Sequence, residues 1–290
     1  MNEIFEKAYA KVNISLDVLG LLPNGYHEMR MVMQSVSLCD DIFISLNGTG
    51  LIRCQSDAAF LPNDEGNIAV RAARKFFAAA GMDSTGADIR IIKRIPTCAG
   101  MGGGSSDGAA VLRGLNRLCG NRFSRAELEA LAAEVGSDIP FCVAGGTQLA
   151  TGTGTTLEDL PSLPDCFFVI CKPSFAIRTP ELFAKIDSRR SRLHPDTAGI
   201  ISALTAGKAE AVACRMYNVF EDVLPRSCGD IALLKGRLLD FGALGSVMTG
   251  TGSALFGIFD SETDAERAFQ QLKKECPECY LAKPVGKILD

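Results

Sequence analysis

The stretch Pro96-Thr-Cys-Ala-Gly-Met-Gly-Gly-Gly-Ser-Ser-Asp107 decides how this sequence is interpreted. Four of the five residues from position 100 to 104 are glycine, and two serines and an aspartate follow at once. Apolar residues then recur with helical spacing over 111–118, whereas residues 87–93 alternate like a strand. We therefore expect a strand, a glycine-rich loop and a helix, with Ser105 or Ser106 as N-cap and Asp107 in the first turn.

Such a loop suits a bound phosphate, because several backbone N–H groups can point at one anion with no Cβ atom in the way. A Walker A loop is excluded, since no Lys followed by Ser or Thr comes after the last glycine. The dinucleotide fingerprint also fails, because Ser105 stands where its third glycine should be. The remaining alternative is a connector that binds nothing, and such connectors rarely need so many glycines beside a double-serine cap.

Composition narrows the function classes. The chain has 290 residues, of which 47% are apolar, so it can bury a large core in two domains or in one large one. A net charge of −4 gives no reason to expect nucleic acid or an anionic membrane as a partner. The N-terminus does not resemble a signal peptide, and no apolar run reaches the roughly 18–20 residues that span a bilayer. We expect a cytoplasmic protein that acts on a small molecule.

The eleven cysteines are expected to be free structural thiols, because a reducing cytosol is the default without a secretion signal. Cys276-Pro-Glu-Cys279 is a lone C-x-x-C pair near the end of the chain. A zinc site would need a second pair of ligands at motif spacing, and the sequence has none. A redox motif would place the pair at a strand-to-helix turn, whereas this pair follows a predicted helix.

The remaining periodicity predicts an α+β fold in two lobes. In the first part we expect strands at 4–10, 13–19, 41–46 and 147–151, and helices at 67–80 and 124–135. Ser124 and Glu127 form the pattern of a capping box for the second helix. A linker at 160–165 follows. Beyond it we expect strands at 166–172, 254–259 and near Tyr280, and helices at 179–186, 195–205, 208–218, 229–240 and 262–274.

Four features occur together in a fixed order: Lys11 with Asn13, the glycine loop, Asp138 after a helix, and Thr-Gly-Thr-Gly at 249–252. In this order they resemble the GHMP small-molecule kinases, whose three motifs match residues 8–17, 96–107 and 247–255. The resemblance implies two α+β lobes with the active site in the cleft between them. It also implies an N-terminal ATP-binding domain at 1–158 and a C-terminal substrate-binding domain at 159–290.

Residues 10–13, 24–27, 67–71, 102–107 and 136–140 resemble one branch of this family more closely. That branch uses ATP to phosphorylate the 2-hydroxyl of an erythritol-type acceptor carrying a cytidine diphosphate group, on the non-mevalonate route to isoprenoid precursors. The alternatives are a homoserine or mevalonate type of kinase, a related decarboxylase, and a nucleotide-binding relative that has lost its chemistry. Loss of chemistry should have removed Lys11 or Asp138, and both are present.

The resemblance implies that Asp138 takes the proton of the acceptor hydroxyl while Lys11 offsets the charge that develops on the γ-phosphate. Phosphoryl transfer to an alcohol needs both functions. Taken alone, Lys11 would be a solvated surface residue and Asp138 a turn residue. The surrounding pattern reverses that interpretation.

The resemblance also assigns the two binding sites. The expected ATP contacts are Asn67, Lys93, Pro96, Thr97, Cys98, Ala99, Gly100, Met101, Gly102, Gly103, Gly104, Ser105 and Ser106. The expected acceptor contacts are Asn13, Tyr26, His27, Thr179, Phe183, Thr249, Gly250, Thr251 and Gly252. Tyr26 and Phe183 would stack on the cytosine and His27 would bond its polar edge. Thr249 to Gly252 would line the diphosphate, although a plain hairpin turn remains an alternative for them.

Mg²⁺ is expected with ATP, and no protein ligand is assigned to it, because such an ion is held mostly by water and phosphate. Three positions depart from the family pattern. Asp107 replaces an Asn, Gly108 replaces an Ala, and Met33 stands where some relatives place an aromatic residue against the substrate. No heptad pattern or surplus amphipathic face marks an interface, so the oligomeric state is left open.

Overall fold

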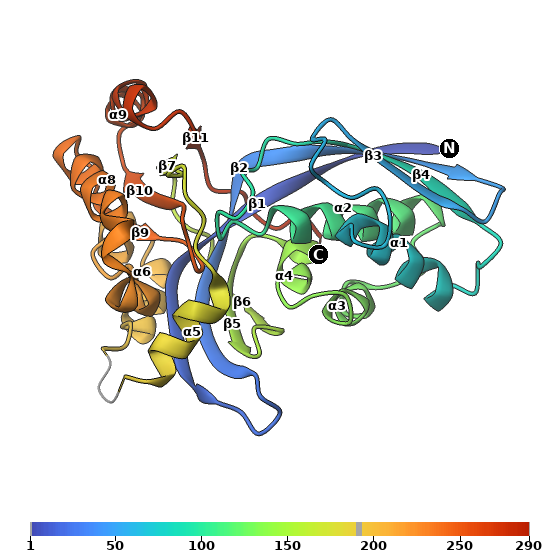
Figure 1. The fold of residues 1–290 in the computed structure, drawn as a ribbon, viewed down its shortest axis with the longest axis horizontal. Coiled ribbons are helices and arrows are strands. Elements are labelled where there is room, and N and C mark those ends of the chain that lie inside the picture. The colour runs from blue at the N-terminus through green and yellow to red at the C-terminus, as the bar shows by residue number, and fades with distance from the viewer. Residues whose placement is uncertain (1, 190–192, 290) are drawn as a thin grey trace.

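The computed structural model describes residues 2–189 and 193–289, which form two β-sheets with helices packed against them (Figure 1). Strands β1 and β2 are the longest elements and run antiparallel from Glu3 opposite Ser45 to Leu21 opposite His27. They join the two halves of the molecule in Figure 1. The Pro23-Asn-Gly25 turn connects them, and the φ of 82° at Gly25 is one that glycine adopts readily.

The first sheet has the strand order β3-β4-β2-β1-β8, and β5 pairs with both β2 and β6. Its strands are β1 Glu3–Leu21, β2 His27–Asn47, β3 Ile52–Ser56, β4 Gly86–Ile92, β5 Thr147–Gly152, β6 Thr156–Asp159 and β8 Tyr217–Asn218. The two strands predicted at 4–10 and 13–19 are one strand, whose pairing with β2 shifts register between Tyr9 and Lys11 and between Asn13 and Ser15. Such β-bulges are common beside functional sites.

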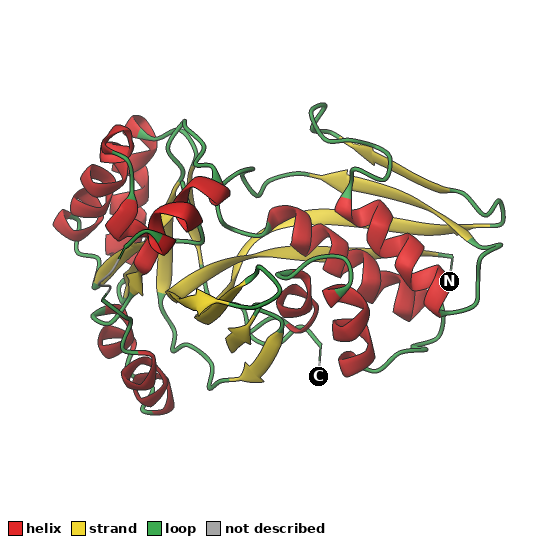
Figure 2. Cartoon of the chain, turned by 60° about the horizontal axis from the view of Figure 1, so that its bottom comes forward, coloured by secondary structure: helices red, strands yellow, loops and turns green. Residues whose placement is uncertain are grey.

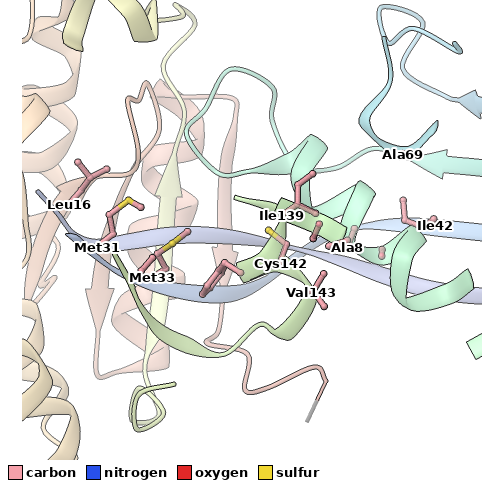
Figure 3. Packing of buried hydrophobic residues seen from close by; sticks show 14 of the residues in the cluster. Ala8, Leu16, Met31, Met33, Ile42, Ala69, Ile139, Cys142 and Val143 are labelled. Carbon is pink, nitrogen blue, oxygen red and sulfur yellow. The ribbon is translucent and has the colours of Figure 1, made fainter. Parts of the chain in front are cut away.

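Four helices cover one face of this sheet (Figure 2). They are α1 Ile68–Ala79, α2 Gly103–Leu118, α3 Arg125–Ala133 and α4 Ile139–Ala144. Phe76 and Phe141 are fully buried in the core beneath them, and each such side chain contributes about 1.5–3 kcal/mol to folding. Figure 3 shows Met31 and Met33 on the long strands together with Ile139 and Val143 of α4.

The second sheet has the antiparallel order β11-β7-β10-β9. Its strands are β7 Phe167–Cys171, β9 Gly245–Met248, β10 Leu255–Phe259 and β11 Cys279–Ala282. The helices of this half are α5 Thr179–Asp187, α6 Thr197–Thr205, α7 Ala209–Ala213, α8 Gly229–Asp240 and α9 Glu262–Glu275, with 3₁₀ turns η1 Val219–Val223 and η2 Arg226–Cys228. In the described ranges, no helix has both the length and the apolar character needed to cross a bilayer.

Two segments of the C-terminal half pair with the first half. Strand β8 pairs in parallel with β1, and Pro284 and Lys287 form bridges with Val36 and Gly145. Strand β1 is therefore paired on one side with its own half and on the other with the C-terminal half. The division into domains at 158/159 stays a prediction.

The structure corrects the predictions for two helices and shows a third helix that was not predicted. Helix α2 begins at Gly103 with Gly102 as its N-cap, and neither serine caps it; Asp107 lies beyond the first turn. The helix predicted at 208–218 ends at Ala213, because Tyr217 and Asn218 pair with β1 instead. Helix α4 was not predicted, since its six residues are too few to show a helical period. The capping box of Ser124 and Glu127 is confirmed.

Candidate active site

Two cavities adjoin at the glycine loop. The first, named the nucleotide-side cavity after the predicted ATP contacts on its wall, has a volume of about 270 Å³. It is lined by residues 95–104, by Lys93 and Asp107, and by Leu61, Pro62, Gly66, Asn67 and Ile68. The second, the acceptor-side cavity, measures about 760 Å³ and is lined by Lys11, Tyr26, His27, Asp138, Thr179, Phe183, Gly250 and Thr251, among others. Gly100 lines both cavities, so a group held at this residue borders on both spaces.

The glycine loop is fixed between β1 and the turn that joins β9 to β10. Lys11 donates its backbone N–H to the carbonyl oxygen of Met101 over 3.0 Å, and Ala254 donates to that of Ala99 over 3.2 Å. Gly100 has a φ of 73°, and a Cβ there would lie 2.2 Å from the carbonyl oxygen of Thr249. This position therefore requires glycine, and the close approach of the two turns depends on it.

The two serines of the loop, Ser105 and Ser106, do not line the nucleotide-side cavity. Ser106 is buried and its Oγ donates a 2.7 Å hydrogen bond to the carbonyl oxygen of Tyr9 on β1. The residues that line the nucleotide-side cavity run from Ile95 to Gly104 and resume at Asp107. Ser105 and Ser106 are therefore beside that cavity without being on its described wall, and their contact with ATP stays a prediction.

Behind the cavity lies a buried cluster of one lysine and two carboxylates. Lys93 Nζ pairs with Asp40 and, over 2.8 Å, with Asp107 Oδ2. Burial raises the pKa of Asp107 to about 7 in spite of Lys93, and the nearby Asp40 raises it further. Burial opposes the charge of Lys93, but the two carboxylates outweigh it and raise the pKa of the ammonium. Asp107 Oδ1 has no hydrogen-bond partner within the described structure.

Asn67 is held by its own helix. Its Oδ1 accepts from the backbone N–H of Ala69 over 3.0 Å, as the N-cap of α1, and its Nδ2 donates to the carbonyl oxygen of Pro62. Lys93 and Asn67 thus line the cavity with polar atoms that already have protein partners. Their roles as ATP contacts stay predictions.

The acceptor-side cavity begins at the pair Lys11 and Asp138. Lys11 Nζ is buried, donates to Asn13 Oδ1 over 2.8 Å, and lies 3.4 Å from Asp138 Oδ2. Asp138 is the N-cap of α4, yet its carboxylate makes no capping hydrogen bond, so it faces Lys11 and the cavity. The stem of Lys11 packs on the glycine loop, where a Cβ at Gly102 would lie 3.1 Å from Lys11 Cγ.

Asn13 connects this pair to the Thr-Gly-Thr-Gly turn. Asn13 Oδ1 accepts hydrogen bonds from the backbone N–H of Gly250 over 3.1 Å and from Thr249 Oγ1 over 3.3 Å. Asn218 Nδ2 supports the same turn through the carbonyl oxygen of Gly250. The turn is a hairpin between β9 and β10, and Gly250 and Thr251 also line the cavity. The hairpin and binding interpretations are therefore compatible.

Aromatic side chains form the far end of the cavity. The rings of His27 and Phe183 stack at 4.3 Å, and Phe220 meets Phe183 edge-on at 5.0 Å. His27 Nε2 lies 2.9 Å from Asp187 Oδ1. Tyr26 is 66% exposed and lies beside this stack on the cavity wall. A flat ligand that forms a hydrogen bond with His27 Nε2 must therefore displace Asp187 from this nitrogen.

Thr179, Gly252 and Met33 complete the comparison with prediction. Thr179 Oγ1 lies 2.8 Å from Thr251 Oγ1, which ties α5 to the turn. Gly252, with a φ of 82°, packs against Met248 and Ile177 instead of lining the cavity. Met33 is fully buried and absent from the described wall, whereas Met31 lines it and accepts a hydrogen bond from Asn13 Nδ2.

Comparison with known proteins gives the family of this chain. Residues 67–146 match the model of the GHMP kinases N terminal domain, and residues 200–278 match that of the GHMP kinases C terminal domain. A 4-diphosphocytidyl-2-C-methyl-D-erythritol kinase of Acetivibrio thermocellus is 39% identical over 285 residues, which cover 98% of this chain and 100% of that protein. The protein of the same name from Bacillus subtilis strain 168 is 37% identical, with 98% of each chain covered. The chain belongs to the 4-diphosphocytidyl-2-C-methyl-D-erythritol kinase family of GHMP kinases.

Solved structures give the same result for the fold. A crystal structure of 4-(cytidine 5'-diphospho)-2C-methyl-D-erythritol kinase has a TM-score of 0.83 at 31% identity and covers 98% of this chain, with 100% of that chain matched. Homoserine kinase from Cytophaga hutchinsonii has a TM-score of 0.77 at 20% identity, with 100% and 96% covered, and shows the fold alone. The predicted two-lobed α+β fold of the GHMP kinases is confirmed.

Sequence reasoning missed several residues that shape this family site. Asp40 neutralises Lys93, Asp187 holds His27, Asn218 supports the Thr-Gly-Thr-Gly turn and Phe220 backs Phe183. Each lies more than 30 residues from its partner along the chain. The sequence offered one signal for these contacts, namely the two acidic residues Asp40 and Asp41 in an otherwise apolar strand pattern. A buried carboxylate implies a buried partner.

Proposed function

We propose that this protein transfers the γ-phosphoryl group of ATP to the 2-hydroxyl of 4-diphosphocytidyl-2-C-methyl-D-erythritol, a step of the non-mevalonate route to isoprenoid precursors. The observation that carries the proposal is the Lys11–Asp138 pair, whose Nζ and Oδ2 atoms are 3.4 Å apart on the wall of the acceptor-side cavity. Gly100 of the glycine loop lines both this cavity and the nucleotide-side cavity. Membership of the kinase family supports the same reaction.

In the proposed mechanism, Asp138 accepts the proton of the acceptor hydroxyl as that oxygen attacks the γ-phosphorus. Lys11 holds both the carboxylate and the hydroxyl, and its ammonium offsets the negative charge that spreads over the transferring group. Asn13 fixes the position of Lys11 through the 2.8 Å hydrogen bond to its Nζ. Most of the rate acceleration then comes from position and charge.

The backbone N–H groups of residues 97–104, near the N-terminus of α2, would hold the phosphates of ATP. We also propose Mg²⁺ as the partner of ATP. Such an ion is bound mostly by phosphate oxygens and water. When bound, the ion would neutralise charge on the β- and γ-phosphates.

The aromatic end of the acceptor-side cavity supports a nucleobase as the recognised group. The exposed face of Tyr26 and the stacked pair His27–Phe183 offer flat surfaces, and a pyrimidine stacks on such surfaces. Gly250 bonds Asn13, the partner of Lys11, and Thr251 contacts Thr179 at the start of α5, so the diphosphate of such an acceptor would pass along this turn. Cytoplasmic location stays a prediction.

The test is ATP-dependent ADP release by the purified protein with Mg²⁺ and a panel of acceptors. The panel is 4-diphosphocytidyl-2-C-methyl-D-erythritol, homoserine, mevalonate, mevalonate diphosphate and galactose, with no-acceptor controls. We expect turnover on the cytidyl acceptor alone. Turnover on another acceptor would contradict the role of Tyr26, His27 and Phe183. ATP binding without turnover on any acceptor would indicate a regulatory protein.

A further inference from the structure

Three of the eleven cysteines meet at one place in the second sheet, away from both cavities. Cys171 is the last residue of β7, and Cys279, the first residue of β11, lies directly opposite it in the antiparallel pair. Their Sγ atoms are 3.7 Å apart. Cys276 ends α9 immediately before, and its Sγ donates to the carbonyl oxygen of Lys172, the neighbour of Cys171. All three side chains are buried.

The geometry suits a disulfide between the opposed strands. Directly opposite residues of an antiparallel pair have Cα atoms about 4.5–5.5 Å apart, and disulfides join Cα atoms about 4.4–6.8 Å apart. Cys171 and Cys279 therefore need only a side-chain rotation, with the sheet left in place. The sequence alone predicts two structural thiols for the C-x-x-C pair Cys276 and Cys279. In the structure a third thiol, that of Cys171, lies beside them, although Cys171 stands 105 positions before Cys276.

The three thiols differ in reactivity. A hydrogen bond from the Cys171 thiol lowers the pKa of Cys276 to about 7, although burial opposes this, so Cys276 is the thiol of the three that most readily loses its proton. Cys171 donates to its neighbours, and the pKa of its thiol is raised. Cys276 also lies at the end of a helix, next to the exposed Pro277, where local opening is easiest. The thiolate is the nucleophile in thiol–disulfide exchange.

We propose that Cys171, Cys276 and Cys279 form a reversible dithiol–disulfide site that reacts with low-molecular-weight disulfides such as oxidised glutathione. The site is independent of the proposed kinase activity. It lies at the end of β7, whose continuation through Lys172 leads to α5 and Thr179 on the acceptor-side cavity.

The exchange proceeds in three steps. The Cys276 thiolate attacks one sulfur of the small disulfide, whose S–S bond breaks, and the leaving thiolate takes a proton from water. Cys171 then attacks Cys276 Sγ and passes its proton to the second small thiolate as that group leaves. Finally Cys279 attacks Cys171 Sγ and gives its proton to solvent, and Cys276 is released as a thiolate. One small disulfide is reduced to two thiols, and two protein thiols are oxidised to one disulfide.

The test treats the full chain with oxidised glutathione, quenches in acid, unfolds, blocks free thiols with iodoacetamide and maps the peptides by mass. In the wild type we expect Cys171 linked to Cys279 or to Cys276, and reduction with dithiothreitol should restore all three thiols. Cys98 and Cys214 are exposed and serve as internal references, since they should carry single glutathione groups. The proposal fails if both references are fully modified while Cys171, Cys276 and Cys279 are all still free.

Variants separate the roles of the three thiols. Cys171→Ser should stop at a glutathione group on Cys276, because the resolving thiol is gone. Cys276→Ser should slow formation of the Cys171–Cys279 link by about tenfold or more. Cys166→Ser is the matched control, since Cys166 is a buried thiol at the other end of β7 and makes no thiol contact with described residues. Unchanged linkage rates in Cys276→Ser, with a native melting curve, would contradict the entry role of Cys276.

Discussion

The two cavities are built in opposite ways. Most of the nucleotide-side wall comes from one stretch, residues 95–104, with Lys93 and Asp107 close to it in sequence, and residues 61–68 supply the rest. The acceptor-side wall is assembled from separate segments near Lys11, Tyr26, Asp138, Thr179 and Gly250. Those segments are brought together by the pairing of β1 with β2, by the start of α4 and α5, and by the hairpin between β9 and β10.

This difference separates what local sequence encodes from what the fold assembles. The glycine loop depends on the φ values available to glycine and on a helix terminus, both of which are properties of neighbouring residues. The Lys11–Asp138 pair depends on a strand and a helix start that are 127 positions apart in the sequence. Substitutions on the acceptor side should therefore act on turnover and acceptor binding, and those behind the loop on stability and ATP.

The largest effect is expected on the acceptor side. Asp138→Asn should lower kcat by a factor of about 10²–10⁴ with a modest change in KM, because the amide cannot accept the hydroxyl proton. Steady-state ADP release with varied acceptor measures both constants. Asp260→Asn is the matched control, since Asp260 is an exposed carboxylate that lies on neither described cavity wall. Near-normal kcat in Asp138→Asn would show that Asp138 is not the base and would contradict the catalytic role of the acceptor-side cavity.

The nucleotide side should respond to pH through Asp107. Its pKa is raised from 3.8 to about 7 in the folded chain, chiefly by burial. The folded state therefore binds more protons than the unfolded state between about pH 4 and pH 7, and the free energy of unfolding falls as the pH rises through that window. One carboxyl can contribute a slope of at most about 1.4 kcal/mol per pH unit.

Asp107→Asn should remove that contribution, since the amide stays neutral and leaves Lys93 paired with Asp40 alone. Urea unfolding at several pH values between 4.5 and 8 measures the difference from the wild type. Asp88→Asn, a change at a half-exposed carboxylate on β4, controls for the loss of an acidic residue. Parallel pH curves for wild type and Asp107→Asn would show that the buried cluster is not destabilised by its second carboxylate.

Much of the fold followed from sequence because many boundaries have local causes. Ser124 and Glu127 form the capping box they predict, Asn67 caps α1, and the Pro23-Asn-Gly25 turn joins two strands. The loop itself was also predicted, although its serines do not cap the helix. Gly102, with a φ of 67°, takes the cap position, and Ser106 bonds Tyr9 instead.

Most of the parts that sequence could not predict depend on long-range pairing. Residues 217 and 218 have a helical pattern, but the open edge of β1 pairs with them and ends the helix at Ala213. Lys93 was expected to face the nucleotide, and its two carboxylate partners are Asp40, 53 residues away, and Asp107. The candidate catalytic residues were found only through resemblance, since neither Lys11 nor Asp138 has a local signal of its own.

Gly100 is the residue at which the two cavities meet, and Gly100→Ala tests whether that contact matters. Alanine at a φ of 73° costs about 1–2 kcal/mol, and its Cβ would also clash with the carbonyl oxygen of Thr249. We expect a total loss of about 2–4 kcal/mol in the free energy of unfolding, with KM raised for both ATP and acceptor. Gly81→Ala is the control: its φ is 65° and nothing lies within 4 Å of the added Cβ. Equal losses in the two variants would mean that the turns tolerate separation.

The smallest effect is expected from Tyr26→Ala. Tyr26 lines the acceptor-side cavity alone, so this variant tests whether the two cavities bind different ligands. Tyr26 is exposed, so its loss should leave the fold intact and remove one stacking surface for the cytosine, worth about 1–3 kcal/mol of acceptor binding. Calorimetry with the acceptor and with ATP measures the two affinities separately. Phe5→Ala, which removes an exposed aromatic ring from β1 outside both described walls, is the control. Weakened ATP binding with normal acceptor binding would place Tyr26 in the ATP site and would contradict the assignment of the two cavities to different ligands.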